Sequence, residues 1–228
     1  MALCWKNARH NLHLVWPVAA WLAICVLMLS LSGCLLGPFF ALFANKSPTV
    51  TVAAQYKLPA GNLLILVDSP AERIGLSGIS PLLSGELASE ISQQGLAPTT
   101  IPARELANLQ ISTENFDQLD IAQIGRRLSA RQVLYVEVIE FTLGTLVDSS
   151  VGRGVVRARV KVFDVGLNQR VWPKTKPLGE EVIVQTPFRE PSGKDYRQEF
   201  TQDLCERTAV AIIKLFREHE EPRRSAGE

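Results

Sequence analysis

The sequence predicts an α/β (α+β) domain in which helices pack on one mixed sheet, behind an N-terminal signal or anchor. Three observations lead to this prediction. A continuous apolar run at Leu63–Val67 has the length of a strand buried on both faces, and segments with helical spacing separate it from later strands. From Gln132 onward apolar residues alternate with a period of two, which indicates an antiparallel sheet. The expected order is β-α-β-α-β-β-β-α.

Strands and helices alternate in the first half of the domain. The apolar strand over 63–67 is followed by a helical pattern over 81–95, where a proline opens the helix and a glycine ends it. A short strand over 99–101 leads to a helical turn over 102–109, which again starts at a proline. Apolar residues then recur at helical spacing over 116–128, so we expect one amphipathic helix there.

Antiparallel strands make up the second half. The first places Leu134, Val136 and Val138 on one side, and Val133, Tyr135, Ile139 and Phe141 on the other. The second places Val156, Ala158, Val160 and Val162 on one side, and Arg157, Arg159 and Lys161 on the other. Edge strands follow over 170–173, where Pro173 fits an edge, and over 181–185. A long helix over 195–218 closes the domain and is expected to lie across the sheet.

The leader has the parts of a bacterial secretory signal. Lys6 and Arg9 supply a basic start, and the run over 14–31 contains no charged residue. This run ends in Leu31-Ser32-Gly33-Cys34, which resembles a lipobox, the motif at which a signal peptidase cuts before a cysteine that carries the lipid. We therefore expect residues 1–33 to be a lipoprotein signal peptide and Cys34 to be the lipid attachment site, with palmitate among its acyl chains.

An uncleaved transmembrane anchor is the alternative, because apolar residues resume after Cys34 and about 20 of them span a bilayer. Pro17, Gly37 and Pro38 interrupt such a helix, which favours cleavage. Both interpretations tether the chain to a bacterial cell membrane, and two or more acyl chains suffice for stable anchoring. Leu35 stands where some inner-membrane lipoproteins have Asp, so a periplasm-facing position on the outer membrane is slightly favoured over the inner one.

Outside the leader the composition is that of one folded domain without a charge bias. Removing the two basic residues of the leader from 24 leaves 22 against 23 acidic ones, so no nucleic acid is expected as a partner. Cys205 alone follows Cys34, and its helical surroundings predict a buried apolar residue. We expect a lipidated N-terminus and linker over 34–61, a single α/β domain over 62–218 and a disordered tail over 219–228.

Three stretches carry a resemblance to a known group of domains. They are the leading strand over 63–68, the helix-to-strand stretch over 124–134, and a hairpin strand over 160–165 that returns at 171–173. In these stretches the chain resembles the small α/β domain of bacterial envelope lipoproteins. That group includes the N-terminal domain of the Tol translocation protein, the curli secretion lipoprotein and the lipoprotein activators of penicillin-binding proteins. The resemblance implies a periplasmic domain that contacts other envelope proteins and has no chemistry of its own.

The residue inventory argues against catalysis. His10 and His13 lie in the leader and His219 lies at the end of the last helix, so the domain has no histidine for a catalytic triad. The sequence has neither the His or Cys spacing of a zinc site nor an EF-hand loop. The glycines of Gly152-Arg153-Gly154 lie in a hairpin and not between a strand and a helix, where phosphate loops occur. We expect no enzyme activity, no cofactor and no metal.

Three cations on one side of a predicted strand are candidate contacts: Arg157, Arg159 and Lys161. They have the charge to bind an anionic polymer or a lipid headgroup. A solvated side of the sheet with cross-strand partners such as Glu137 or Glu140 explains them more simply, and we favour it.

Asp68 and Trp172 are two further candidate contacts. Asp68 stands at the carboxyl end of the first buried strand, where α/β sheets hold ligands, although Asp68-Ser69-Pro70 is also typical of a turn. Trp172 either anchors an edge strand or offers an exposed aromatic ring to a partner. We favour the turn and the packed edge strand.

Two functions of different classes remain. The first is a membrane-anchored periplasmic lipoprotein that acts as a non-catalytic interaction or assembly module of the cell envelope. Its partner is expected to be an envelope protein, and homo-oligomer formation stays open. The second is a small-molecule sensor with its site near Asp68 and Thr100. A deep pocket there favours the sensor, and a flat apolar edge near Trp172 favours the module. A signal-anchored inner-membrane protein with a periplasmic domain is a third interpretation.

Overall fold

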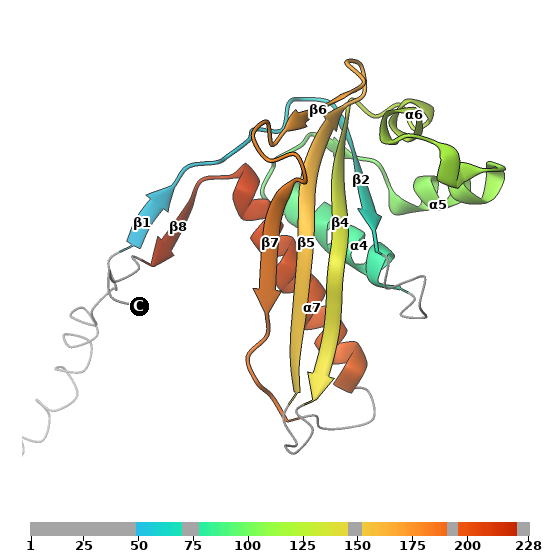
Figure 1. Cartoon of the computed structure of the whole chain (residues 1–228). Coiled ribbons are helices and arrows are strands. Elements are labelled where there is room, and N and C mark those ends of the chain that lie inside the picture. Colours follow the sequence, from blue (N-terminus) through green and yellow to red (C-terminus); the bar gives the residue numbers. More distant parts are fainter. Residues whose placement is uncertain (1–48, 70–77, 146–151, 191–195, 223–228) are drawn as a thin grey trace, which may run out of the picture. The chain divides into compact units, whose positions relative to one another are not determined.

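A computed structural model describes residues 49–69, 78–145, 152–190 and 196–222 (Figure 1). The described elements are, in chain order, β1 (Thr49–Val52), β2 (Asn62–Asp68), α4 (Ile79–Gln93), β3 (Thr99–Thr100), α5 (Ala103–Ser112), the 3-10 helix η2 (Phe116–Gln118), α6 (Ile121–Arg127), β4 (Gln132–Thr145), β5 (Gly152–Asp164), β6 (Gln169–Trp172), β7 (Glu180–Gln185), α7 (Tyr196–Ile213), the 3-10 helix η3 (Lys214–Phe216) and β8 (His219–Pro222). The predicted signal peptide and Cys34 lie outside these residues. Within the described ranges, no helix is both long and apolar enough to cross a membrane.

The chain divides into two compact units, one of Met1–Val50 with Pro222–Glu228 and one of Thr51–Glu221. A mixed sheet forms the centre of the second unit, in the strand order β3-β2-β4-β5-β6 with β7 also paired to β5. β2 runs parallel to β3 and β4, whereas β5 is antiparallel to β4, β6 and β7. The predicted mixed α/β fold is confirmed.

β6 and β7 pair with the same edge of β5, because β5 is long enough for both. β7 pairs with Val155–Val160 and β6 with Val162–Asp164. The expected edge strands therefore lie one after the other along β5, and each is short because it uses only part of that edge (Figure 1).

Helices pack on both faces of the sheet. α4 and α7 lie on one face, in a core cluster that takes Ile65 and Val67 from β2. α6, with partly buried residues of α5, lies on the other face over Leu64 and Leu66. Since successive side chains of a strand point to opposite faces, β2 is buried on both sides, as its uninterrupted apolar sequence predicts.

A β-bulge in β4 changes the side of the sheet to which Phe141 points, so the expected side is wrong. The register of β4 against β5 shifts between Val138 and Glu140, which adds one residue to the alternation. Phe141 is consequently 9% exposed and belongs to the cluster that contains Leu134, not to the side of Val133 as expected. Apolar residues on both sides of the bulge hide this shift in the sequence.

The single helix expected over 116–128 is two elements, η2 and α6. Asp120 starts the second, because its Oδ1 accepts a hydrogen bond from the Gln123 N–H at 2.6 Å and its own N–H donates to Gln123 Oε1 at 2.9 Å. This reciprocal pair is a capping box, which fixes a helix N-terminus. Asn115, with φ of 61°, turns the chain into η2.

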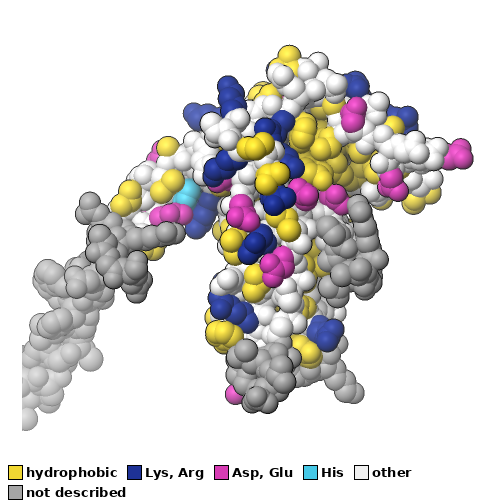
Figure 2. All heavy atoms as spheres, in the orientation of Figure 1, with side chains coloured by type: hydrophobic (Ala, Val, Ile, Leu, Met, Phe, Trp, Pro, Cys, Tyr) yellow, Lys and Arg dark blue, Asp and Glu magenta, His cyan; other side chains and the backbone are white. Residues whose placement is uncertain are grey.

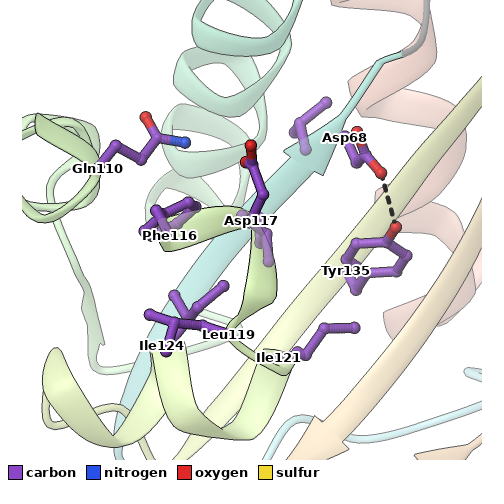
Figure 3. A pocket seen from close by; sticks show the side chains of 10 residues that line it. Asp68, Gln110, Phe116, Asp117, Leu119, Ile121, Ile124 and Tyr135 are labelled. Atoms are coloured by element: carbon purple, nitrogen blue, oxygen red, sulfur yellow. Dashed lines mark hydrogen bonds between the residues drawn. The ribbon is translucent and has the colours of Figure 1, made fainter. Parts of the chain in front are cut away.

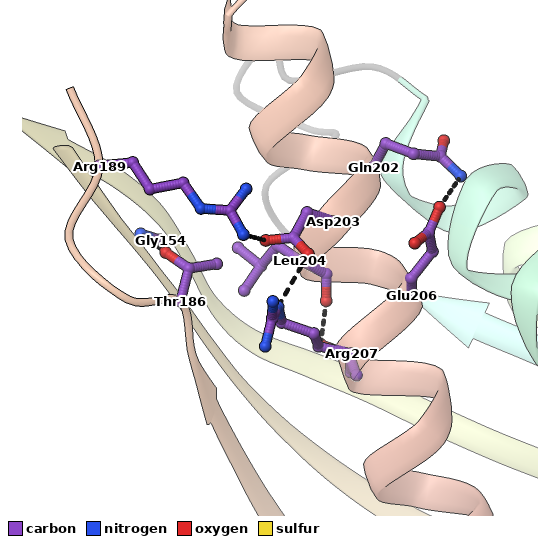
Figure 4. Close-up of polar contacts among 9 residues, drawn as sticks. Gly154, Thr186, Arg189, Gln202, Asp203, Leu204, Glu206 and Arg207 are labelled. Carbon is purple, nitrogen blue, oxygen red and sulfur yellow. Dashed lines mark hydrogen bonds and ion pairs between the residues drawn. The ribbon is translucent and has the colours of Figure 1, made fainter. Parts of the chain in front are cut away.

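The segment after β7 is hydrogen-bonded to β5 and forms an ion pair with α7 (Figure 4). The Gly154 N–H donates to Thr186 Oγ1 at 2.8 Å, and the Thr186 N–H donates to the Gly154 carbonyl oxygen at 3.0 Å. A Cβ at Gly154 would stand 2.8 Å from Leu204 Cδ2, so glycine lets α7 approach β5 closely. Asp203 of α7 also lies 3.5 Å from Arg189 Nη2, in the segment after β7.

The C-terminal end differs from the expected one. α7 ends at Ile213, and His219–Pro222 form β8, which pairs with β1 in a two-stranded sheet. The disordered tail expected over 219–228 is therefore wrong for His219–Pro222, and 223–228 lie outside the described residues. Backbone pairing gives this segment its structure, and polar side chains without apolar alternation do not signal such pairing.

Candidate functional site

The residues predicted to contact a partner or ligand fall in three different places. Asp68 ends β2, the three predicted cations lie along β5, and Trp172 ends β6. Cys34, the predicted lipid attachment site, lies outside the described residues. The three places have different surroundings, and a cleft lies at that of Asp68.

Three cations of β5 lie on the side away from α4 and α7: Arg157, Arg159 and Lys161. Basic and acidic side chains are interspersed on the visible face of the molecule (Figure 2). Lys161 Nζ lies 3.2 Å from Glu137 Oε2, and Arg157 Nε lies 3.8 Å from both Glu140 Oε2 and Glu181 Oε1. Arg159 stands opposite Glu137 and Glu181 in the strand register. The ion pairs with Glu137 and Glu140 are the cross-strand partners that the sequence suggested, and they place negative charges between the cations.

Trp172 is part of the core. Its side chain is 7% exposed, and its ring lies 6.2 Å from that of Tyr56 and 5.4 Å from that of Phe216, measured between ring centres. The contact with Phe216 is edge-to-face and the contact with Tyr56 is tilted, and ring separations of this size are typical of packed aromatic residues. The structure thus supports the packing interpretation, and the ring is not available to a partner.

Cys205 is buried in α7, with 1% of its surface exposed. Burial raises the pKa of its thiol to about 12, and the charges of Glu86 and Glu206 act in the same direction. The thiolate is the reactive form of cysteine, so a thiol with this pKa is not a nucleophile near neutral pH. The prediction of a buried apolar residue is confirmed.

A cleft of about 650 Å³ lies beside the carboxyl end of β2 (Figure 3). The lining residues are Leu66, Val67 and Asp68 of β2, Gln110 of α5, Phe116 and Asp117 of η2, Leu119, Ile121 and Ile124 in or just before α6, and Tyr135 of β4. The polar ends of Gln110, Asp117 and Asp68 lie toward one end of the cleft, and the apolar side chains of α6 line the other. The cleft therefore has an apolar floor and an acidic rim.

The topology of the sheet places the cleft at this end of β2. β3 and β4 flank β2 in parallel, while α4 lies on one face of the sheet and α6 on the other. Open α/β sheets bind ligands outside the carboxyl ends of strands where connections diverge in this way. Asp68 reaches the cleft because it directly follows the buried run of β2.

A tyrosine contacts the carboxylate of Asp68. Tyr135 Oη donates a hydrogen bond to Asp68 Oδ2 at 3.1 Å, and Lys161 Nζ lies 5.4 Å from the centre of the Tyr135 ring. Among the described residues that line the cleft there is no histidine, cysteine, serine or lysine. In the described part of the chain, no group of three or more His, Cys, Asp or Glu side chains is placed to hold a metal.

Thr100 does not share the cleft, contrary to the expectation that it and Asp68 flank one site. β3 is two residues long, and Thr100 pairs with Leu63 at the start of β2, whereas Asp68 stands at its end. Asp68 is the one lining residue that the sequence singled out. Asp117 and Tyr135 come from separate elements without a local motif, and only tertiary packing brings them beside Asp68.

No model of a known protein family matches the chain, and no curated protein matches its sequence. Solved structures with a similar fold include a PelC dodecamer from Paraburkholderia phytofirmans, 16% identical with a TM-score of 0.44 over 75% of this chain and 97% of that one. Lipoprotein GNA1162 from Neisseria meningitidis is 17% identical, with a TM-score of 0.40 over 67% of this chain and 99% of its own. The LpoB C-terminal domain from Salmonella enterica is 14% identical, with a TM-score of 0.32 over 59% and 84%. These are likenesses of fold.

We predict that Cys205 does not react with iodoacetamide in the folded full-length chain at about pH 8, and does react after unfolding in urea. The pKa of the thiol is about 12 in the folded state against an ordinary value of 9.0, so thiolate is scarce until the chain unfolds. By the same difference, the protonated thiol stabilises the fold below pH 9.0, and this contribution is lost as the pH rises toward about 12. Mass spectrometry of the peptide that contains Cys205 measures the alkylation, and equal rates with and without urea would contradict its burial.

Proposed function

We propose that the chain is a lipid-anchored lipoprotein of the bacterial envelope, whose domain binds a protein partner at the cleft beside Asp68 without catalysis. The observation that carries this proposal is the cleft at the carboxyl end of β2, with its apolar floor and polar rim. Apolar surface with a few convergent polar groups is the usual composition of a binding site.

The N-terminal sequence supports the anchored part of the proposal. Leu31-Ser32-Gly33-Cys34 has the form of a lipobox, and acyl chains on Cys34 would hold the domain at a membrane. Leu35 after the cysteine favours sorting to the outer membrane, with the domain in the periplasm.

The open rim favours a protein partner over a small molecule. Asp117 and Gln110 are exposed where they border the cleft, whereas small-molecule sites bury most of their ligand. The Trp172 ring lies in the core, so it offers no exposed aromatic surface to a partner at β6. We therefore assign the partner to the cleft and not to the edge strand β6.

A small-molecule sensor is the second candidate. The cleft volume of about 650 Å³ falls within the range of ligand pockets, roughly 300–1,000 Å³, which is the observation in its favour. Its position beside Asp68 is also the one that the sensor hypothesis requires.

Intact mass of the membrane-extracted protein tests the anchor, with a Cys34→Ala variant beside it. We predict that the wild-type species begins at Cys34 and carries acyl groups, and that the variant keeps its leader and is not acylated. The reason is that both cleavage and acylation require the cysteine. A full-length, unacylated mass in both would contradict the lipoprotein assignment and support an uncleaved inner-membrane anchor.

A photoreactive amino acid at position 110 tests the cleft in the full-length chain, expressed in its own cells. We predict a discrete adduct of protein size from Gln110→p-benzoylphenylalanine, because this side chain borders the cleft. Asn108 is the matched control, since it is exposed on the same helix and does not line the cleft.

The mass of the adduct separates the two candidates. An adduct of small mass at position 110 alone would favour the sensor over the interaction module. No adduct at either position, or equal adducts at both, would contradict binding at the cleft.

A further inference from the structure

One flank of β2 is not covered by a strand along its last residues. β3 pairs only with Asn62 and Leu63, whereas β4 pairs with all of Leu63–Asp68. In the described ranges, no other strand pairs with β2. Among the described strands, none pairs with the flank from Leu64 to Val67, which we call the free flank.

The backbone groups on the free flank belong to Ile65 and Val67. In a parallel sheet the N–H and C=O of one residue point to one neighbour, and those of the next residue point to the other. The Asn62 carbonyl accepts from the Arg131 N–H at 2.8 Å, beside β4, and the Leu63 carbonyl accepts from the Ile101 N–H at 2.9 Å, beside β3. By this alternation, Ile65 and Val67 direct their N–H and C=O to the free flank.

These backbone groups lack protein partners within the described part of the chain, where no hydrogen bond joins them on that side. Ile65 and Val67 are 5% and 9% exposed as whole residues, so little of their surface reaches solvent. Buried backbone groups almost always have a hydrogen-bond partner, because an unpaired one costs as much as a lost hydrogen bond. An added strand along the free flank would supply these bonds.

The cleft borders the free flank. Val67 lines it together with Leu66 and Asp68, so the cleft reaches the main chain at the end of β2 (Figure 3). Side chains alternate along a strand. An extended segment on the free flank would therefore place every second side chain over the cleft and the others on the face of the sheet that carries α4.

The charge of the cleft selects the side chain that would enter it. The described lining residues include two carboxylates, those of Asp68 and Asp117, and among these described residues there is no lysine or arginine. Apolar side chains of β2, η2 and α6 line the other part of the cleft. Lysine and arginine have an apolar stem and a cationic end, so they match both the floor and the acidic rim.

We infer that the occupant is an extended segment of the protein partner, which adds a strand to the free flank and directs a lysine or arginine to Asp68 and Asp117. This inference rests on the proposed function and names how the partner is recognised. Main-chain hydrogen bonds to Ile65 and Val67 provide affinity that does not depend on the partner's side chains. The cleft provides specificity for the basic side chain.

A displayed library of random nine-residue peptides, selected on the full-length chain in detergent, tests this inference. We expect enriched peptides to have alternating β-branched residues and one lysine or arginine. Synthetic copies with an N-methyl group at each position in turn should lose binding by about tenfold or more at alternate positions only, because every second amide pairs with β2.

Two matched variants test the charge. Asp117→Asn should weaken an enriched peptide about tenfold, since it removes one carboxylate from the rim. Glu114→Gln should leave the affinity unchanged, because Glu114 is exposed and lies outside the cleft lining. A peptide with norleucine in place of its basic residue should bind the wild type and Asp117→Asn equally. Fluorescence anisotropy measures each affinity.

Three outcomes overturn the inference: no enrichment, enrichment without a basic residue, or N-methyl effects without alternation. A protein adduct from position 110 together with any of these outcomes would keep the proposed function and remove only the strand-pairing mode. Loss of both the adduct and the enrichment would remove both.

Discussion

The fold depends on the burial of β2 on both of its faces. Leu63, Ile65 and Val67 enter the core cluster with α4 and α7, whereas Leu64 and Leu66 enter the cluster with α6. Each such side chain stabilises the fold by about 1.5–3 kcal/mol when it is fully buried. Because both helix layers pack on this strand, its position fixes where the connections leave the sheet. The cleft lies at that point, beside the carboxylate that ends the strand.

The surfaces around β2 differ in what they offer to a partner. The far side of the sheet at β5 carries interspersed charges, which suits contact with water. The aromatic cluster around Trp172 is closed, because its rings pack on one another and on the core. The cleft combines apolar surface, two carboxylates and a strand edge with which, beyond Leu63, no described strand pairs. The contact surface that we propose therefore lies at the carboxyl end of β2.

Periodicity made several elements predictable and left others hidden. β2 and β5 follow directly from an apolar run and a strict alternation, and Asp68 could be singled out because it ends a buried strand. The bulge between Val138 and Glu140 could not be predicted from the alternation of apolar residues, because β4 has apolar residues on both faces around it. The length of β3 and the positions of Asp117 and Tyr135 depend on tertiary packing. The sequence therefore suggested Thr100 as the neighbour of Asp68, and it did not indicate Asp117 or Tyr135.

Amide hydrogen exchange at Val67 and Leu66, followed by NMR in the isotopically labelled full-length chain, tests most directly that β2 has one paired and one free flank. By the alternation of a parallel strand, the Leu66 N–H points to β4 and the Val67 N–H points to the free flank. We predict that Val67 exchanges at least about tenfold faster than Leu66 in the unbound chain. Equal protection of the two amides would contradict this description, because it would mean that another part of the chain already pairs with the free flank.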